Sequence, residues 1–106
     1  MRYILNTTFH LDASIEKAWV VFLTKEQFPL LKTENLCSDI LFTRVRVEEE
    51  EESPAYSLQL VFETKNQYHC FRERHHEPFL KTLASCFPGR FVYFCTTLEE
   101  VLPYEF

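Results

Sequence analysis

A predicted hairpin in the middle of the chain constrains the fold more than any other stretch. Two runs rich in aliphatic and aromatic residues, 40–47 and 55–64, lie on either side of five glutamates, a serine and a proline at 48–54. This composition is typical of two antiparallel strands joined by a polar loop. Because adjacent glutamates repel one another, we interpret the run 48–52 as a solvated loop rather than an acidic recognition loop.

A strand and a helix are predicted before this hairpin. Residues 3–11 alternate between apolar and mostly polar side chains, which is the pattern of a strand with one buried face. Asp12 can cap the helical pattern that follows. Proline disfavours helical backbone at the preceding residue, so we expect this helix to end near Gln27 and Pro29 to open a short second turn through Leu31.

A second helix and a last strand are predicted after the hairpin. Residues 65–87 carry a helical pattern, which Pro78 must kink or split. Gly89, the only glycine in the chain, is expected to supply the positive φ of the turn into the last strand, residues 90–101. That strand is apolar on both faces, so it requires a second covering layer.

This element order predicts the fold class. The order βαββαβ is that of an α+β, ferredoxin-like fold, with a four-stranded antiparallel sheet of order 4-1-3-2 and two helices on one face. The length of 106 residues suits one hydrophobic core and is too short for two, so we expect a single domain over 1–106.

Charge and cysteine usage limit the partners and the location. The net charge is −5, and the five glutamates of the loop account for all of it. The rest of the chain has no basic stripe, which disfavours nucleic acid. The four cysteines form no C-x-x-C pair, and neither a signal peptide nor a membrane-spanning stretch is present. We therefore expect a cytoplasmic protein with reduced thiols and no membrane contact.

Few motifs for chemistry are present. A single glycine excludes the usual phosphate-binding loops, and no arrangement of a hydrolase triad is evident, so we expect no cofactor. His69, Glu73 and His76 have a spacing that zinc accepts on a helix. We favour an exposed polar surface for these three residues and expect no metal there. His75 falls on the apolar side and is interpreted as a histidine at the edge of the core.

The sheet face away from the helices is the best candidate for a site. Leu41, Val45 and Val47 are expected to need the helix side, which turns Arg44 to the open face. A mixed apolar and polar face of this kind should be covered by a second subunit, a ligand or both, and a homodimer interface is favoured over a ligand pocket. The residues expected there are Ile4, Asn6, Thr8, His10, Ser57, Gln59 and Val61, with Phe42, Arg44 and Arg46 beyond one edge and Tyr93, Cys95 and Thr97 beyond the other.

Short motifs along nearly the whole chain resemble a known family. They are Leu5-Asn6-Thr7-Thr8-Phe9, Trp19, Phe28-Pro29, Arg44-Val45, Tyr56-Ser57-Leu58-Gln59 and Phe94-x-Thr96-x-Leu98-Glu99. In order and spacing they resemble a small bacterial family of uncharacterised proteins, a domain of unknown function. The resemblance implies a ferredoxin-like fold related to the dimeric α/β barrels. It also implies that Asn6, Arg44, Ser57 and Gln59 are the matching positions for a function.

The chain departs from that family at two positions. The family has a histidine before its Ile-Pro pair and an arginine inside the last-strand motif, where this chain has Gln27 and Cys95. A function that needs those two side chains is therefore not expected. The resemblance transfers no activity, because fold analogy to barrel monooxygenases or isomerases is only analogy.

The leading hypothesis is a homodimer that binds a small anionic or carbonyl-bearing molecule over the open sheet face. Arg44 would either clamp an anion or pair with Gln59, or with Glu63 or Glu99 of a second chain. One alternative is a cofactor-independent enzyme with His10 or Tyr93 as acid or base. Another is a purely structural interaction module. The predicted ligand-binding residues are Asn6, His10, Arg44, Ser57, Gln59 and Tyr93.

Overall fold

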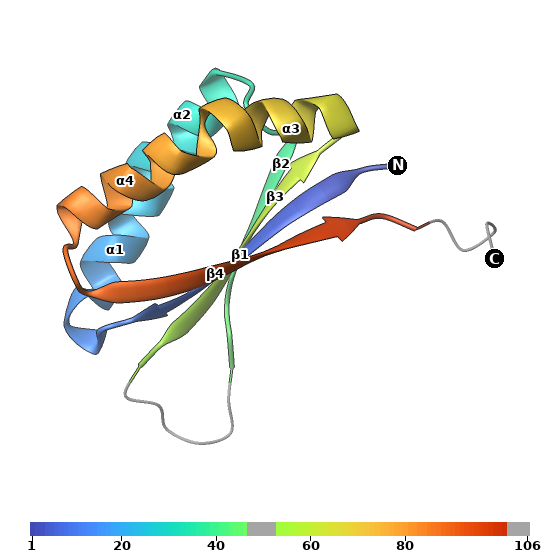
Figure 1. Cartoon of the computed structure of the whole chain (residues 1–106). Helices are drawn as coiled ribbons and strands as arrows, with labels where there is room; N and C mark the ends of the chain where they lie inside the picture. The colour runs from blue at the N-terminus through green and yellow to red at the C-terminus, as the bar shows by residue number, and fades with distance from the viewer. Residues whose placement is uncertain (47–52, 102–106) are drawn as a thin grey trace.

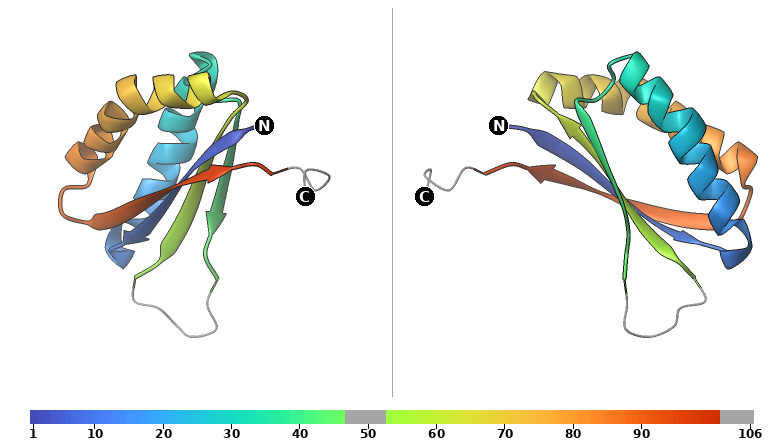
Figure 2. Two further views of the ribbon diagram at one scale, coloured as in Figure 1. Left: turned by 45° about the vertical axis from the view of Figure 1, so that its right-hand side comes forward. Right: turned by 180° about the vertical axis from the view of Figure 1, so that it is seen from behind.

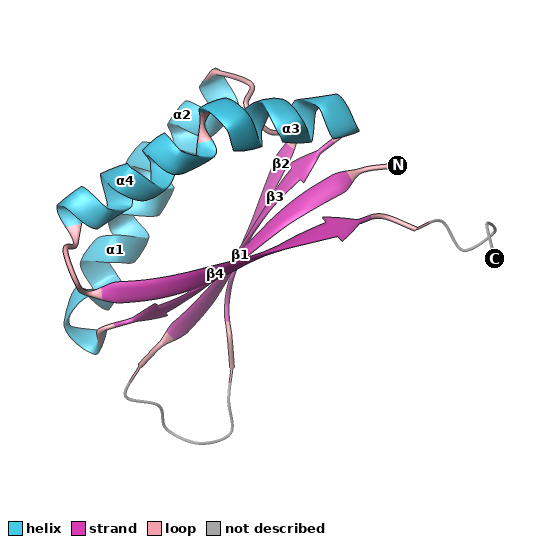
Figure 3. Ribbon diagram, viewed as in Figure 1, coloured by secondary structure: helices cyan, strands magenta, loops and turns pink. Residues whose placement is uncertain are grey.

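The chain folds into one sheet with a layer of helices on one side of it (Figures 1 and 3). The computed structural model describes residues 1–46 and 53–101, so the glutamate run 48–52 and Val47 lie outside the described residues. The elements are β1 (Tyr3–Leu11), the 3-10 helix η1 (Ala13–Ile15), α1 (Glu16–Phe22), the π-helical turn η2 (Leu23–Gln27), α2 (Phe28–Thr33), β2 (Asp39–Arg44), β3 (Ala55–Phe62), α3 (Lys65–Arg74), α4 (His76–Cys86) and β4 (Phe91–Glu99).

The sheet confirms the predicted topology. Its four strands are antiparallel in the order β2-β3-β1-β4, so β1 and β3 are central and β2 and β4 are edge strands. The two further views show the helices on the same side of this twisted sheet, and no helix of residues 1–46 and 53–101 lies on the other side (Figure 2). This is the arrangement expected of the ferredoxin-like α+β fold.

The first helical stretch is longer than predicted. Asp12 caps its start, because Oδ1 accepts a hydrogen bond from the Ser14 N–H at 2.9 Å. The predicted boundary at Gln27 is where the π-helical turn η2 ends, and the predicted second turn is α2, which follows without a break and runs to Thr33 instead of Leu31. Pro29 lies in the first turn of α2. A proline has no N–H to donate, and a local π-helical turn is one way in which a helix accommodates an altered hydrogen-bond pattern.

The second helical stretch is split, as predicted, but earlier than at Pro78. The break falls at His75, whose φ of −122° and ψ of −22° are not helical. Pro78 then lies in the first turn of α4, where a missing N–H leaves no intrahelical bond unmade. Gly89 has the predicted positive φ, 68°, in the turn into β4.

The core lies between the helices and one face of the sheet, and it consists mainly of leucine and aromatic side chains. The ring of Phe9 on β1 lies 5.0 Å from the ring of Trp19 on α1, and both side chains are fully buried. Aromatic pairs at such separations add stability beyond the area that they bury. The other most buried large side chains are Leu5, Leu11, Leu23, Leu58, Phe62, Phe71 and Leu83.

The predicted orientation is correct for the central strands and wrong for both edge strands. On β2, Ile40 and Phe42 pack on the core, whereas Leu41 is 55% exposed on the opposite face. Arg44 therefore points to the helix side together with Phe42. On β4, Cys95 and Phe91 pack on the core, so Tyr93 and Thr97 also face the helices. Both edge strands carry apolar side chains on each face, so the apolar pattern alone does not determine their orientation.

Candidate functional site

The open face of the sheet has a polar centre formed by the two central strands. Asn6 on β1 lies opposite Gln59 on β3, and Thr8 lies opposite Ser57. The Ser57 hydroxyl donates a hydrogen bond to Asn6 Oδ1 at 2.8 Å. These four side chains are half-buried, although no element of the described chain covers them. This bond occupies the amide oxygen of Asn6 and leaves its Nδ2 donor without a hydrogen bond among the described residues.

Apolar side chains of the edge strands surround this polar centre. Val92 is 67% exposed and Phe94 is 55% exposed, on the face opposite to Tyr93 and Cys95. Since β1 and β4 are in register, Phe94 lies beside Thr8 and Val92 beside His10. We call this surface the open face; its residues are Ile4, Asn6, Thr8 and His10 of β1, Leu41 and Thr43 of β2 with Val45 after it, Ser57 and Gln59 of β3, and Val92, Phe94, Thr96 and Leu98 of β4.

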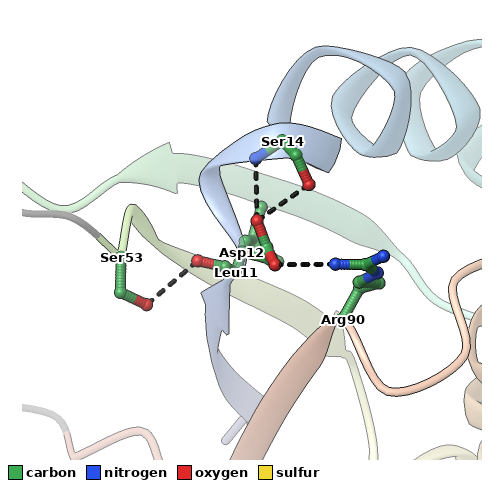
Figure 4. Close-up of polar contacts among 5 residues, drawn as sticks. All are labelled: Leu11, Asp12, Ser14, Ser53 and Arg90. Carbon is green, nitrogen blue, oxygen red and sulfur yellow. Dashed lines mark hydrogen bonds and ion pairs between the residues drawn. The ribbon is translucent and has the colours of Figure 1, made fainter.

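A shallow cavity of about 490 Å³ lies at the end of β1, where the open face meets the loops. The His10 ring borders it and stacks on Phe94 with the ring centres 6.3 Å apart. On its other side Arg90 Nη1 donates to Asp12 Oδ2 at 3.1 Å, as Figure 4 shows. The pKa of Asp12 lies below its usual 3.8, first because of the hydrogen bonds from Ser14 and then because of the bond from Arg90. The cavity is therefore bordered by an ion pair and an imidazole.

Arg44 is not part of the open face, which corrects the sequence prediction. Its Nε lies 3.3 Å from Glu16 Oε2 of α1, and the Tyr56 hydroxyl donates to the same oxygen at 2.8 Å. Burial and then this bond to Glu16 raise the pKa of the Tyr56 hydroxyl. The Arg44 guanidinium thus pairs within its own chain on the helix side. It is not placed to clamp an anion over the open face.

Tyr93 is also on the helix side, so it does not lie with His10. Its ring packs 6.1 Å from the buried ring of Phe9. The neighbouring Cys95 on the same face lies with its Sγ 3.8 Å from His76 Nε2 of α4. Of the six predicted ligand-binding residues, the structure brings Asn6, His10, Ser57 and Gln59 to one face and places Arg44 and Tyr93 on the other.

The His69, Glu73 and His76 arrangement does not form a common surface. His69 and Glu73 are exposed, whereas His76 is buried against Cys95 and Phe71. The prediction that His76 lies on an exposed polar surface is therefore wrong, because His76 is buried. His75 is half-buried, as expected of a histidine at the edge of the core. Across residues 1–46 and 53–101, no three His, Cys, Asp or Glu side chains are grouped closely enough to hold a metal.

Sequence reasoning missed the apolar half of the site. Val92, Phe94 and Leu98 alternate with Tyr93, Cys95 and Thr97, and either set reads as a core face. A signal was present, because a strand that is apolar on both faces requires a cover on each. The Arg90 and Asp12 ion pair joins residues that are distant in sequence, and no local pattern indicates it.

The chain belongs to a family defined by a domain of unknown function, DUF4286, whose family model matches residues 2–101. This confirms the resemblance found in the sequence motifs. No curated protein matches the chain in sequence. Within the described residues, none of the helices combines the length and apolar character needed to cross a membrane.

Solved structures share the fold at low sequence identity. An ethyl tert-butyl ether d (ethd) family protein from Bacillus halodurans is similar with a TM-score of 0.67 and 12% identity, over 93% of this chain and 99% of that chain. A dimeric ferredoxin-like protein from an uncultured marine organism has a TM-score of 0.64 and 9% identity, over 95% and 96% of the two chains. A putative antibiotic biosynthesis monooxygenase from Bacillus cereus has a TM-score of 0.60 and 12% identity, over 95% and 96%. These similarities show the ferredoxin-like fold.

Proposed function

We propose that the protein is a cytoplasmic homodimer in which two open faces pack together and enclose a small, neutral, carbonyl-bearing molecule at the polar centre. The observation that carries this proposal is the composition of the open face, a polar centre within an apolar border. The four cysteines are unpaired, which supports a reducing compartment.

The apolar border supports the dimer. Leu41, Val92 and Phe94 are each more than half exposed, and they lie on the two edge strands of one face. A contiguous exposed apolar surface of this kind is typical of an interaction site. A second copy is the occupant that we favour, because the same border on two identical faces is self-complementary about a two-fold axis. The marine ferredoxin-like proteins of similar fold are described as dimeric, which supports the same arrangement.

The polar centre supports a ligand within that dimer. Pairing of two faces would remove water from the amides of Asn6 and Gln59, and a buried amide without a partner costs about 1–3 kcal/mol. The Oδ1 of Asn6 already accepts from Ser57, so Nδ2 is the group that requires an acceptor. Gln59 makes no side-chain hydrogen bond with the rest of the described residues. A carbonyl oxygen between the two amides would satisfy these donors.

The charge of the site favours a neutral ligand over an anion. With Arg44 paired to Glu16 on the helix side, the polar centre formed by Asn6, Thr8, Ser57 and Gln59 carries no cation. Of the two residues considered as acid or base, His10 lies at the end of this polar centre, whereas Tyr93 lies on the helix side. An enzymatic role would therefore rest on His10 alone.

Native mass spectrometry of freshly purified protein tests the proposal. We expect a dimer that carries an additional small-molecule mass, released on denaturation. Gln59→Leu should remove the additional mass and should leave the dimer intact. The matched control is Gln27→Leu, because Gln27 is a half-buried glutamine on the helix side. It should retain the ligand.

The outcomes separate the parts of the proposal. A dimer with protein mass alone would contradict the ligand, and a monomer would contradict both ligand and dimer. Turnover of a panel of quinones and lactones by the wild type, lost in His10→Gln, would identify an enzyme instead of a binding protein.

A further inference from the structure

A second cavity lies on the helix side of the sheet, away from the open face. It has a volume of about 460 Å³ and opens between α3, α4 and β4. Arg72 of α3, His76 and Lys81 of α4 and Tyr93 of β4 line it. Because this cavity is on the helix side of the sheet, the proposed dimer would leave it accessible.

A half-buried thiol, that of Cys95, contacts the imidazole of His76, which lines this cavity. Cys95 Sγ lies 3.8 Å from His76 Nε2 and 3.7 Å from Thr7 Oγ1. His76 is only 9% exposed, and its ring packs 5.9 Å from the ring of Phe71, which fixes its orientation. Burial, and then the nearby charge of Arg72, lower the pKa of His76 below 6.5. The imidazole is therefore neutral at pH 7 and is able to accept a proton from the thiol.

The cations at the mouth of the cavity are not equivalent. Lys81 Nζ pairs with Glu77 Oε1 at 3.1 Å. Arg72 Nη1 donates to the Tyr68 hydroxyl at 2.8 Å, and within residues 1–46 and 53–101 no carboxylate lies within ion-pair distance of it. A guanidinium with a neutral partner keeps donors available for an anion.

We propose that this cavity is a reactive-thiol site for small anions that carry an electrophilic carbon. Arg72 binds the anionic group, and His76 accepts the proton of the Cys95 thiol. The sulfur electron pair forms the new C–S bond as the bond from that carbon to its leaving group breaks. The leaving group departs with the bonding pair, and His76 then releases its proton to solvent. This step consumes no oxidant or reductant.

Alkylation with two matched reagents tests this site in the full chain. Iodoacetate and iodoacetamide have the same leaving group and differ by a carboxylate against a neutral amide. Peptide mass spectrometry reads each cysteine separately, so that the exposed Cys70 and Cys86 serve as internal controls. We expect the iodoacetate-to-iodoacetamide rate ratio to be several-fold higher at Cys95 than at these two cysteines.

Two variants separate the roles of the cation and the base. Arg72→Gln should lower the rate ratio at Cys95 roughly fivefold, the size of a solvent-exposed charge interaction. Arg74→Gln, which removes an exposed arginine of the same helix, should leave the ratio unchanged. His76→Gln should slow both reagents at Cys95 at least about tenfold at pH 7 with the ratio retained. An Arg72→Gln effect that is equal at all three cysteines would overturn the proposal.

The pH dependence of the wild type keeps the test decisive if His76→Gln does not fold. The charged and titratable groups around His76 are Arg72 from α3, Glu77 and Lys81 from α4, and Tyr93 and Cys95 from β4. If His76 accepts the proton, alkylation of Cys95 should stay fast from pH 8 to pH 6 while that of Cys70 and Cys86 falls steeply. Parallel decline at all three cysteines would contradict the role of His76.

Discussion

The two faces of the sheet are built on different principles. The helix side is closed by side chains that are fully buried, with Phe9 and Trp19 in contact at its centre. The open face places hydrogen-bonding side chains at its centre and exposed apolar ones at its border. A core is stabilised by close packing within the chain. Exposed apolar side chains gathered on one face are typical of an interaction surface, and a few polar groups placed among them are typical of a ligand site.

The difference between the faces explains why the edge strands are apolar on both sides. β1 and β3 offer one apolar and one polar face, whereas β2 and β4 place apolar groups on each. On the helix side those groups complete the core of the chain. On the open face they have no cover within the described residues, which is the basis for proposing a second copy there.

The largest expected effect comes from comparing the truncation of a leucine to alanine on each of the two faces. Leu58 is 1% exposed in the core, and Leu41 is 55% exposed on the adjacent strand of the open face. In a monomeric Phe94→Glu background, Leu58→Ala should lower the free energy of unfolding by about 2–5 kcal/mol. Leu41→Ala should lower it by less than about 1 kcal/mol. Urea unfolding measures both, and equal losses would mean that the faces do not differ as described.

A pH-dependent loss of stability is expected from the helix side. The pKa of His76 is lowered in the folded chain, so the unfolded chain takes up a proton first as the pH falls below 6.5. The contribution of His76 is therefore complete above pH 6.5 and is lost as the pH falls through its folded pKa. Between pH 7 and pH 5 the wild type should lose more unfolding free energy than His76→Gln. The exposed His69→Gln is the control, and it should follow the wild type.

The smallest effect is expected at Arg44. Its guanidinium and Glu16 are both partly exposed, and such ion pairs contribute about 0–1 kcal/mol. Arg44→Gln should therefore lower the free energy of unfolding by less than about 1 kcal/mol and should leave dimer affinity and ligand mass unchanged. Arg74→Gln gives the baseline for losing one arginine charge. A large fall in dimer affinity on Arg44→Gln would instead place Arg44 at the dimer interface and contradict this assignment.

The sequence was sufficient to predict the topology and the orientation of the central-strand residues of the candidate site. Element order and the single apolar face of β1 determined strand order and the outward direction of Asn6, Ser57 and Gln59. The orientation of the Arg44 side chain follows from that of Phe42 on the same strand. The ring of Phe42 packs against Trp19 of the core, with the ring centres 5.7 Å apart, so Arg44 lies on the helix side as well. That contact joins distant parts of the chain, so no local pattern reveals it.

The buried histidine was misassigned for a related reason. A continuous helix over 65–87 places His75 on the apolar side, but the backbone breaks at His75 and α4 begins a new helical phase. His76 is thereby turned toward Cys95. Pro78 indicated that a break exists without indicating its position, because a proline is accommodated anywhere in the first turn of a helix.

Sedimentation velocity tests most directly whether the open face is a homodimer interface. The wild type should sediment as a dimer at micromolar concentration. Phe94→Glu, which places like charges on both faces, should weaken the dimer at least about 100-fold. Leu30→Glu also replaces an exposed apolar side chain by glutamate, but on α2, and this variant should remain dimeric. A wild-type monomer at that concentration, or a Phe94→Glu dimer as tight as the wild type, would contradict the account.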